Sequence, residues 1–112
     1  MQEEAKEEIF IIVEEMPEFP DGGEAGLRAW IAKSIEYPVI AQENGIQGKV
    51  YVTFVVDKDG SISEAKVIRG VDPSLDKEAL RVVNSLPKWK PGKQRGKPVR
   101  VSYTVPISFV LQ

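Results

Sequence analysis

The segment from Leu86 to Arg100, LPKWKPGKQRGKPVR, carries the residues whose types and spacing come closest to a chemical function. It holds a tryptophan and no acid, and its cations are Lys88, Lys90, Lys93, Arg95, Lys97 and Arg100. Cations around an aromatic ring can bind single-stranded nucleic acid through its phosphates and stacked bases. The same composition also fits a crossover from a helix to a strand, in which lysines keep the strand edge soluble. Both interpretations are open from this segment alone.

Residue types that support catalysis or metal binding are absent or wrongly spaced. The chain has no cysteine and no histidine, which excludes thiol nucleophiles, disulfides, Cys/His zinc sites and histidine acid–base chemistry. The D-x-D-G motif at Asp57 departs from a calcium loop, because its glycine falls fourth instead of sixth and Ile68 replaces the twelfth-position glutamate. Neither GIQGKV nor PGKQRGK matches the sequence motif of a phosphate-binding loop. The adjacent carboxylates Glu14 and Glu15 are expected to be solvated surface charges and not a catalytic pair. We expect no cofactor, no metal and a plain hairpin turn at Asp57.

The overall charge argues against a general nucleic-acid binder. The 112 residues suit one domain, and their formal net charge is −2. An acidic N-terminus balances the basic segment; its acids are Glu3, Glu4, Glu7, Glu8, Glu14, Glu15 and Glu18. Residues 1–8 are predicted to be a disordered acidic lead-in, and residues 9–112 are predicted to form the domain.

Hydrophobic periodicity predicts an α+β fold. Short apolar or alternating runs predict strands, and apolar residues at helical spacing predict helices. The second long helix is predicted to begin with Asp72 as its N-cap and Pro73 at its first position. Trp30 and Trp89 are expected to be core residues first. The order strand, helix, strand, strand, helix, strand predicts a two-layer domain, with two main helices on one face of a mainly antiparallel sheet of three to four strands. The predicted elements cover residues 9–13, 24–35, 50–56, 62–68, 73–86 and 99–111.

Several motifs in their order resemble one known family, the C-terminal domain of TonB. The motifs are the Tyr37-Pro38 pair with Ala41 after it, GIQG, D-x-D-G, LDKEALRVV and WKPGKQRGKPV. The resemblance covers roughly residues 17–111. The lead-in MPEFPDGG is similar to the version found in Bacteroidetes-type energy transducers.

This resemblance implies a non-catalytic, periplasmic peptide-binding module, expected to be a monomer with a dimer possible. Such domains are tethered by a proline-rich linker to one inner-membrane helix, expected to lie outside this sequence, which works with a proton-driven motor complex. They grip the TonB box, a peptide of outer-membrane receptors, by strand addition, which opens the receptor to siderophores, cobalamin or glycans. The same domain also occurs in envelope sensor peptidases and in self-associating envelope proteins, and both alternatives are open, as is a residual nucleic-acid or enzymatic role.

The resemblance and the residues together predict a peptide-binding site. Family contacts lie on the final strand and just before the Tyr-Pro pair, where this chain has glutamate and the best-known members have glutamine. Pro106 has no N–H, so its lateral side of the final strand is predicted to be a free edge. Lys97 and Arg100 are expected to favour an acidic peptide. The predicted site residues are Glu36, Tyr37, Pro38, Val99, Arg100, Val101, Ser102, Tyr103, Thr104 and Val105.

A segment of the chain itself is a second candidate for that edge. Residues 9–13, IFIIV, form strands readily and are flanked by acids. They could occupy the edge as a placeholder that a receptor peptide must displace.

The first prediction concerns metal. Thermal melts recorded with EDTA and with added Ca²⁺ are expected to overlay, because the register at Asp57 supplies no calcium loop. A rise of the melting temperature with Ca²⁺ would contradict this expectation.

Overall fold

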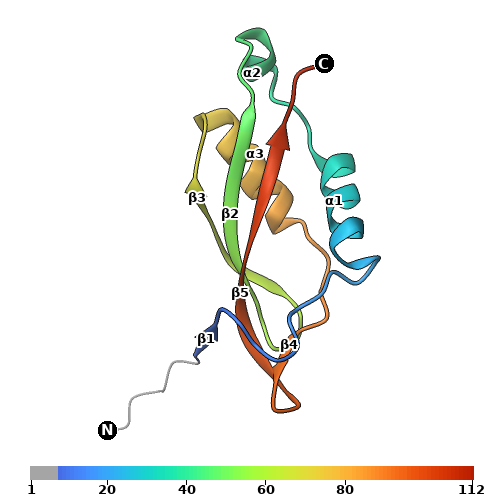
Figure 1. The fold of residues 1–112 in the computed structure, drawn as a ribbon. Helices are drawn as coiled ribbons and strands as arrows, with labels where there is room; N and C mark the ends of the chain where they lie inside the picture. Colours follow the sequence, from blue (N-terminus) through green and yellow to red (C-terminus); the bar gives the residue numbers. More distant parts are fainter. Residues whose placement is uncertain (1–7) are drawn as a thin grey trace, which may run out of the picture.

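The computed structural model describes residues 8–112, so the predicted acidic lead-in lies outside the described residues except for Glu8. The described chain is elongated, with its two ends far apart (Figure 1). Its elements in order are β1 (Ile9–Phe10), α1 (Gly23–Ser34), α2 (Val39–Glu43), β2 (Gly48–Val56), β3 (Ile62–Arg69), α3 (Pro73–Asn84), β4 (Gly92–Gln94) and β5 (Lys97–Phe109).

The sheet has the strand order β1-β5-β2-β3, and β4 also pairs with β5. The central pair, β2 with β5, is antiparallel, and so are the β2–β3 and β4–β5 hairpins. Only β1 runs parallel to its neighbour, with Ile9 opposite Arg100 and Phe10 opposite Val101. The predicted α+β class is confirmed, and β1 and β4 make the sheet mixed and five-stranded.

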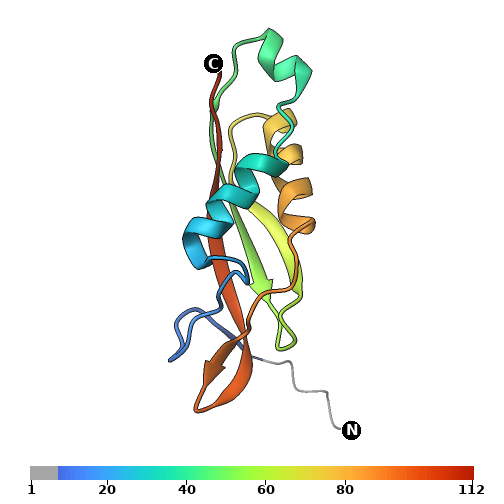
Figure 2. The ribbon, with the colours of Figure 1, turned by 90° about the vertical axis from the view of Figure 1, so that its right-hand side faces the viewer.

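One hydrophobic core lies between the sheet and the two longer helices. The helix α3 packs on β2 and β3, and α1 lies beside β5 (Figures 1 and 2). The start of α3 is fixed as predicted, because the Asp72 carboxylate accepts a hydrogen bond from the Ser74 N–H and Pro73 follows at the first position. Alternation on β2 buries Val50, Val52, Phe54 and Val56, and the same rule buries alternate residues of β5.

Trp89 is the centre of an aromatic cluster in this core. Its ring centroid lies 5.9 Å from Phe19, 5.6 Å from Phe54 and 5.0 Å from Tyr103, in edge-to-face arrangements. Only 4% of Trp89 is exposed. Trp30 is half-buried and packs against the core with its ring 6.4 Å from that of Phe19, so the two tryptophans contribute unequally.

The basic segment is a hairpin, which the sequence analysis missed. Gln94 pairs with Lys97 across a two-residue turn, in which Arg95 has a φ of 54° and Gly96 a φ of 76°. Two consecutive positive φ angles match the right-handed twist of a hairpin. The strand predicted over residues 9–13 is also shorter than expected, since only Ile9 and Phe10 pair.

Trp89→Ala is expected to lower the free energy of unfolding by about 3–5 kcal/mol, because it empties the centre of the aromatic cluster. Trp30→Ala should cost less than half as much, since that ring is partly exposed. Urea unfolding followed by circular dichroism measures both. Trp89→Phe is the matched control: it keeps an aromatic ring and removes an indole N–H that has no partner among the described residues. Equal losses of unfolding free energy in Trp89→Ala and Trp30→Ala would contradict the placement of Trp89 at the centre of the aromatic cluster.

Candidate functional site: the free edge of β5

Two edges of the sheet lack a neighbouring strand in the described part of the chain, and they differ in character. The edge formed by β3 is interrupted where Thr53 pairs with Lys66 and Val55 pairs with Ser63, which leaves an extra residue on β3. Glu64, at this bulge, has a φ of 52°. The bulge and the charges of Glu64, Lys66 and Arg69 discourage another strand from pairing there.

The edge of β5 carries no such protection between residues 102 and 108. On one side β5 pairs with β2 from Val101 to Phe109. On the other side β1 covers only Arg100 and Val101, and no described strand continues beyond them. The residues at alternate positions of this edge are uncharged: Ser102, Thr104, Pro106 and Ser108. An extended segment could therefore pair here without meeting a charged side chain of β5.

The direction of the main-chain groups follows from Pro106. It stands opposite Tyr51 of β2 and has no N–H, so it suits a position whose main chain points away from β2. Main-chain groups alternate in direction along a strand, so those of Ser102, Thr104 and Ser108 also point to the open side.

A groove of about 360 Å³ lies between this edge and α1. Apolar side chains line it, chiefly Leu27 and Ile31 of α1 and Ile35 just after the helix, and β5 contributes the stretch from Tyr103 to Pro106 with Ser108. Its charged members are Glu24, Arg28 and Lys49. The groove has an apolar wall and a mixed-charge rim, which suits alternate side chains of an added strand.

A second hollow of about 420 Å³ continues from the groove, since Glu24, Leu27 and Tyr103 line both. It reaches Trp89 and the segment from Met16 to Phe19. Burial, and then the negative charge of Glu24, raises the pKa of Tyr103 above its usual value of 10.0. The phenol is therefore neutral at physiological pH and can donate a hydrogen bond.

Arg100 is held on the outer face of the sheet and does not point into the groove's lining. Its Nε donates to Asp57 Oδ1 at 2.7 Å, and its Nη2 donates to Glu64 Oε2 at 2.6 Å. The hydrogen bonds that Arg100 donates to Glu64 and Asp57 raise the pKa of Arg100, so the guanidinium is permanently charged and already paired. The expectation that Arg100 attracts an acidic peptide does not fit this geometry; the side chain secures the β3 bulge instead.

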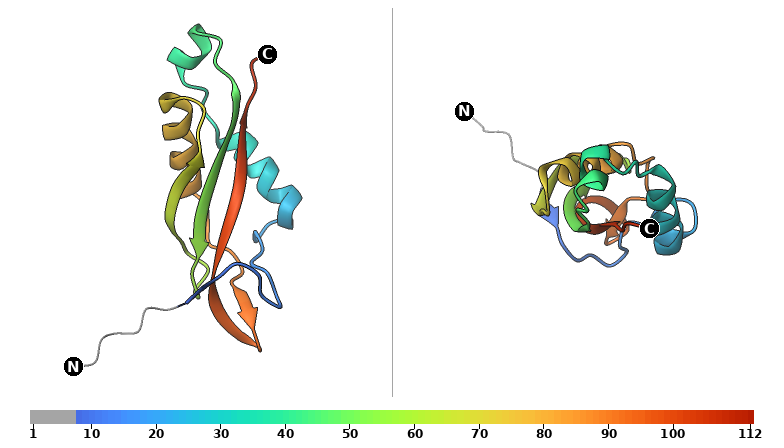
Figure 3. Two further views of the ribbon diagram at one scale, coloured as in Figure 1. Left: turned by 60° about the vertical axis from the view of Figure 1, so that its left-hand side comes forward. Right: turned by 90° about the horizontal axis from the view of Figure 1, so that it is seen from above.

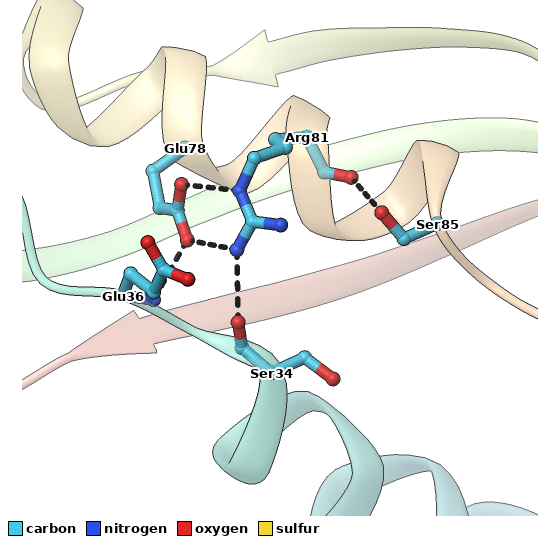
Figure 4. A network of polar contacts seen from close by, with 5 residues as sticks. All are labelled: Ser34, Glu36, Glu78, Arg81 and Ser85. Atoms are coloured by element: carbon cyan, nitrogen blue, oxygen red, sulfur yellow. Dashed lines mark hydrogen bonds and ion pairs between the residues drawn. The ribbon is translucent and has the colours of Figure 1, made fainter.

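The residues before the Tyr-Pro pair belong to a separate polar network (Figure 4). The Glu36 N–H donates to Glu78 Oε2 at 2.7 Å. Arg81 donates to both oxygens of Glu78, at 2.8 and 2.7 Å, and to the Ser34 carbonyl at 2.9 Å. These contacts tie the end of α1 to α3. The Glu36 side chain itself is exposed.

Tyr37 is a packing residue at the same end of the molecule. Its hydroxyl donates to the Ile46 carbonyl, and its ring meets Phe109 edge-on at 5.6 Å. Pro38 begins α2 at this end. Phe109 ends β5, whereas Val99 pairs with Gly92 at the beginning of the strand.

The predicted site residues therefore fall into two groups at opposite ends of β5. Val101 and Phe109 are eight positions apart, about 26 Å of extended chain. The edge from Ser102 to Ser108 connects the two groups. Sequence reasoning missed the α1 wall of the groove; the only signal was the apolar stripe of that helix, which also indicates ordinary core packing.

An unpaired, uncharged sheet edge beside an apolar groove is the geometry that strand addition uses in general. Comparison with known proteins is more specific. Residues 33–111 match the family described as Gram-negative bacterial TonB protein C-terminal, and the chain belongs to this family. The family resemblance seen in the sequence is thus confirmed; its Bacteroidetes-type detail stays a prediction. The family consists of non-catalytic transducers, and the chain is not an enzyme.

Two curated relatives are both called Protein TonB. The one from Haemophilus influenzae is 42% identical over 93 residues, which cover 79% of this chain and 33% of that protein. The one from Helicobacter pylori strain 26695 is 30% identical over 83 residues, covering 73% and 28%. The chain thus spans about a third of the length of these relatives.

The fold has solved counterparts. The NMR solution structure of Helicobacter pylori TonB-CTD, residues 194–285, superposes with a TM-score of 0.60 at 27% identity and covers 77% of this chain and 90% of that one. The longer form, residues 179–285, gives a TM-score of 0.60 at 25% identity, covering 84% and 89%. Among residues 8–112, no helix is long and apolar enough to cross a membrane.

Glu78→Gln is expected to destabilise the domain at neutral pH but not in acid. The hydrogen bond from Arg81, with smaller help from the Glu36 N–H, lowers the pKa of Glu78 below its ordinary value of 4.5. A carboxyl whose pKa is lowered by folding stabilises the fold above its unfolded pKa, and this stabilisation is lost as the pH falls through the folded pKa. Urea midpoints of the two proteins should therefore differ at pH 7 and converge below pH 4.5. A difference that persists unchanged at pH 2 would show that the ion pair is not its source.

Proposed function

We propose that this domain binds an extended peptide by strand addition along β5, from Ser102 to Ser108. The observation that supports it is the unpaired, uncharged edge beside the apolar wall of α1. Main-chain hydrogen bonds would supply affinity, and the groove would select side chains. The proposal shifts the site predicted from the sequence toward the C-terminal end of β5, because Val99, Arg100 and Val101 already have strand partners.

The geometry also defines the ligand's pattern. Side chains of a strand alternate between faces, so every second residue of the peptide would enter the groove beside Leu27 and Ile31. The intervening residues would lie on the outer face, near the hydroxyl groups of Thr53 and Thr104. A segment with apolar residues at alternate positions fits this arrangement. Pro106 offers a carbonyl but no N–H, so it limits the continuous ladder.

Family membership supports the identity of the partner. The peptide is the TonB box of an outer-membrane receptor, and the domain transmits energy from the inner membrane for nutrient uptake. The domain then lies in the periplasm, on a protein anchored in the inner membrane and driven by a proton-powered motor complex. The relatives named Protein TonB, of which this chain spans about a third, support this architecture. A sensor-peptidase parent is the second candidate, and the gene sequence upstream of Met1 distinguishes the two.

Titration with a seven-residue TonB-box peptide should move the amide signals of residues 102–108 and leave those of β3 in place. Thr104→Pro should weaken binding about tenfold, because it removes one edge donor and leaves a peptide carbonyl unpaired. Thr104→Val is the matched control: it keeps the N–H and should bind like the wild type. The affinity should also change little between low and moderate salt, unlike phosphate binding. Shifts centred on residues 62–69 would refute the proposed edge.

A further inference from the structure

The segment from Ile9 to Val13 is only partly used in the fold. Ile9 and Phe10 pair with Arg100 and Val101 of β5. Ile11 and Ile12, which follow at once, are 73% and 81% exposed. Five consecutive apolar residues with high strand propensity thus contribute two pairs, and two large aliphatic side chains are left in water.

If the parallel pairing of β1 with β5 continued in its present register, it would cover the free edge of β5. Ile9 lies opposite Arg100 and Phe10 opposite Val101, so continuing the parallel pairing would place Ile11 beside Ser102. Val13 would then reach Thr104. These are the first positions of the edge to which the peptide is assigned above.

Polar contacts with β4 hold the chain away from that edge. Glu15 and Lys93 exchange two main-chain hydrogen bonds, of 3.0 and 2.8 Å. The Glu14 N–H donates to Gln94 Oε1 at 3.0 Å, and the Arg95 N–H donates to Glu14 Oε1 at 2.7 Å. Most of the residues involved are exposed, so each contact contributes little to stability. Figure 3 shows this N-terminal segment running past the β4–β5 hairpin on its way to α1.

Residues 14–18, which connect Val13 to Phe19, are long enough for Val13 to move along β5. Phe19 is 4% exposed and packs against Trp89, so it stays in the core. Residues 14–18 can span about 17 Å when extended. Phe19 and Tyr103 line the same hollow, next to Thr104, so the chain can run from the edge back to Phe19 with Phe19 in place. Val13, which is 8% exposed in the position described, has to leave its buried site.

We propose that residues 9–13 form an internal strap with two positions on β5. In the position described, Ile9 and Phe10 dock, Glu14 and Glu15 hold β4, and the edge from Ser102 is open. In the second, Ile11 to Val13 extend the parallel strand over Ser102 to Thr104 and close the first part of the binding edge. The side chain of Ile12 then enters the groove beside Tyr103, whereas that of Ile11 lies on the outer face beside Ser102, and the hydrogen bonds of Glu14 and Glu15 are given up. As a regulator of that edge, the strap rests on the proposed function.

A disulfide lock tests the strap. Two residues that exchange both main-chain hydrogen bonds have Cα atoms about 5.5 Å apart, within disulfide range. The chain has no cysteine, so Glu15→Cys with Lys93→Cys forms a single defined bridge. Oxidation should hold Glu15 on β4 and keep Val13 from the edge.

The first readout needs no ligand. The Thr104 N–H points to the open side, so its exchange with solvent reports whether the strap covers it. Exchange should be faster in the oxidised lock than in the wild type, by a factor set by how much of the time the second position covers Thr104, and reduction should restore the slower rate. Equal Thr104 exchange in the oxidised and reduced forms overturns the strap, whatever the peptide does.

The second readout is peptide affinity, which should rise about tenfold in the oxidised lock. Ile11→Gly with Ile12→Gly should raise it as well, because glycine removes the strand propensity of the strap. Val110→Gly, at an apolar side chain that is 63% exposed at the other end of the molecule, is the control and should change nothing. An exchange difference without any peptide binding would refute the proposed function and leave the strap standing. Peptide binding with equal affinity in all forms would refute the strap alone.

Discussion

The antiparallel pairing of β2 with β5 is the interaction on which the other features depend. It runs from Gly48 opposite Phe109 to Val56 opposite Val101 without a shift. Side chains and main-chain groups both alternate along a strand, so this register buries Val105 and Ile107 and at the same time turns the main chain of Thr104 outward. A slip of one residue would expose the apolar set and place Pro106 where β2 requires a donor. The buried core and the free edge of β5 therefore both follow from the register of β2 with β5.

The length of β5 divides that edge into parts with different partners. β5 begins at Lys97, well before its pairing with β2 begins at Val101. The early residues are covered by β4 and by β1, and only the later ones face α1 across a groove. The helix lies close enough to shape the groove but does not fill it. This leaves an edge that is shielded from a broad sheet but accessible to a single narrow strand, which is how a soluble domain can keep unpaired main-chain groups.

The sequence predicted the parts of the fold that have strong periodicity, and it failed where the signal is short or tertiary. The stripe of Leu75, Ala79, Val82 and Val83 and the cap at Asp72 predicted α3 closely. β4 has three residues and no apolar alternation, and its turn puts a non-glycine residue, Arg95, at positive φ, so no pattern indicated it. The free side of β5 could be reasoned from Pro106 alone. The groove could not, because it depends on where α1 lies relative to that edge.

Three of the six cations of the basic segment form ion pairs within the described part of the chain. Lys88 lies 3.7 Å from Asp59, Lys90 lies 3.9 Å from Glu18, and Arg100 holds Asp57 and Glu64. These pairs lie away from the stretch of β5 from Ser102 to Ser108, whose outward-facing side chains are uncharged. Recognition at such an edge depends on main-chain pairing, which any extended segment can offer. Discrimination between partners must then come from the apolar wall of α1, and from whatever competes for the edge within the chain itself.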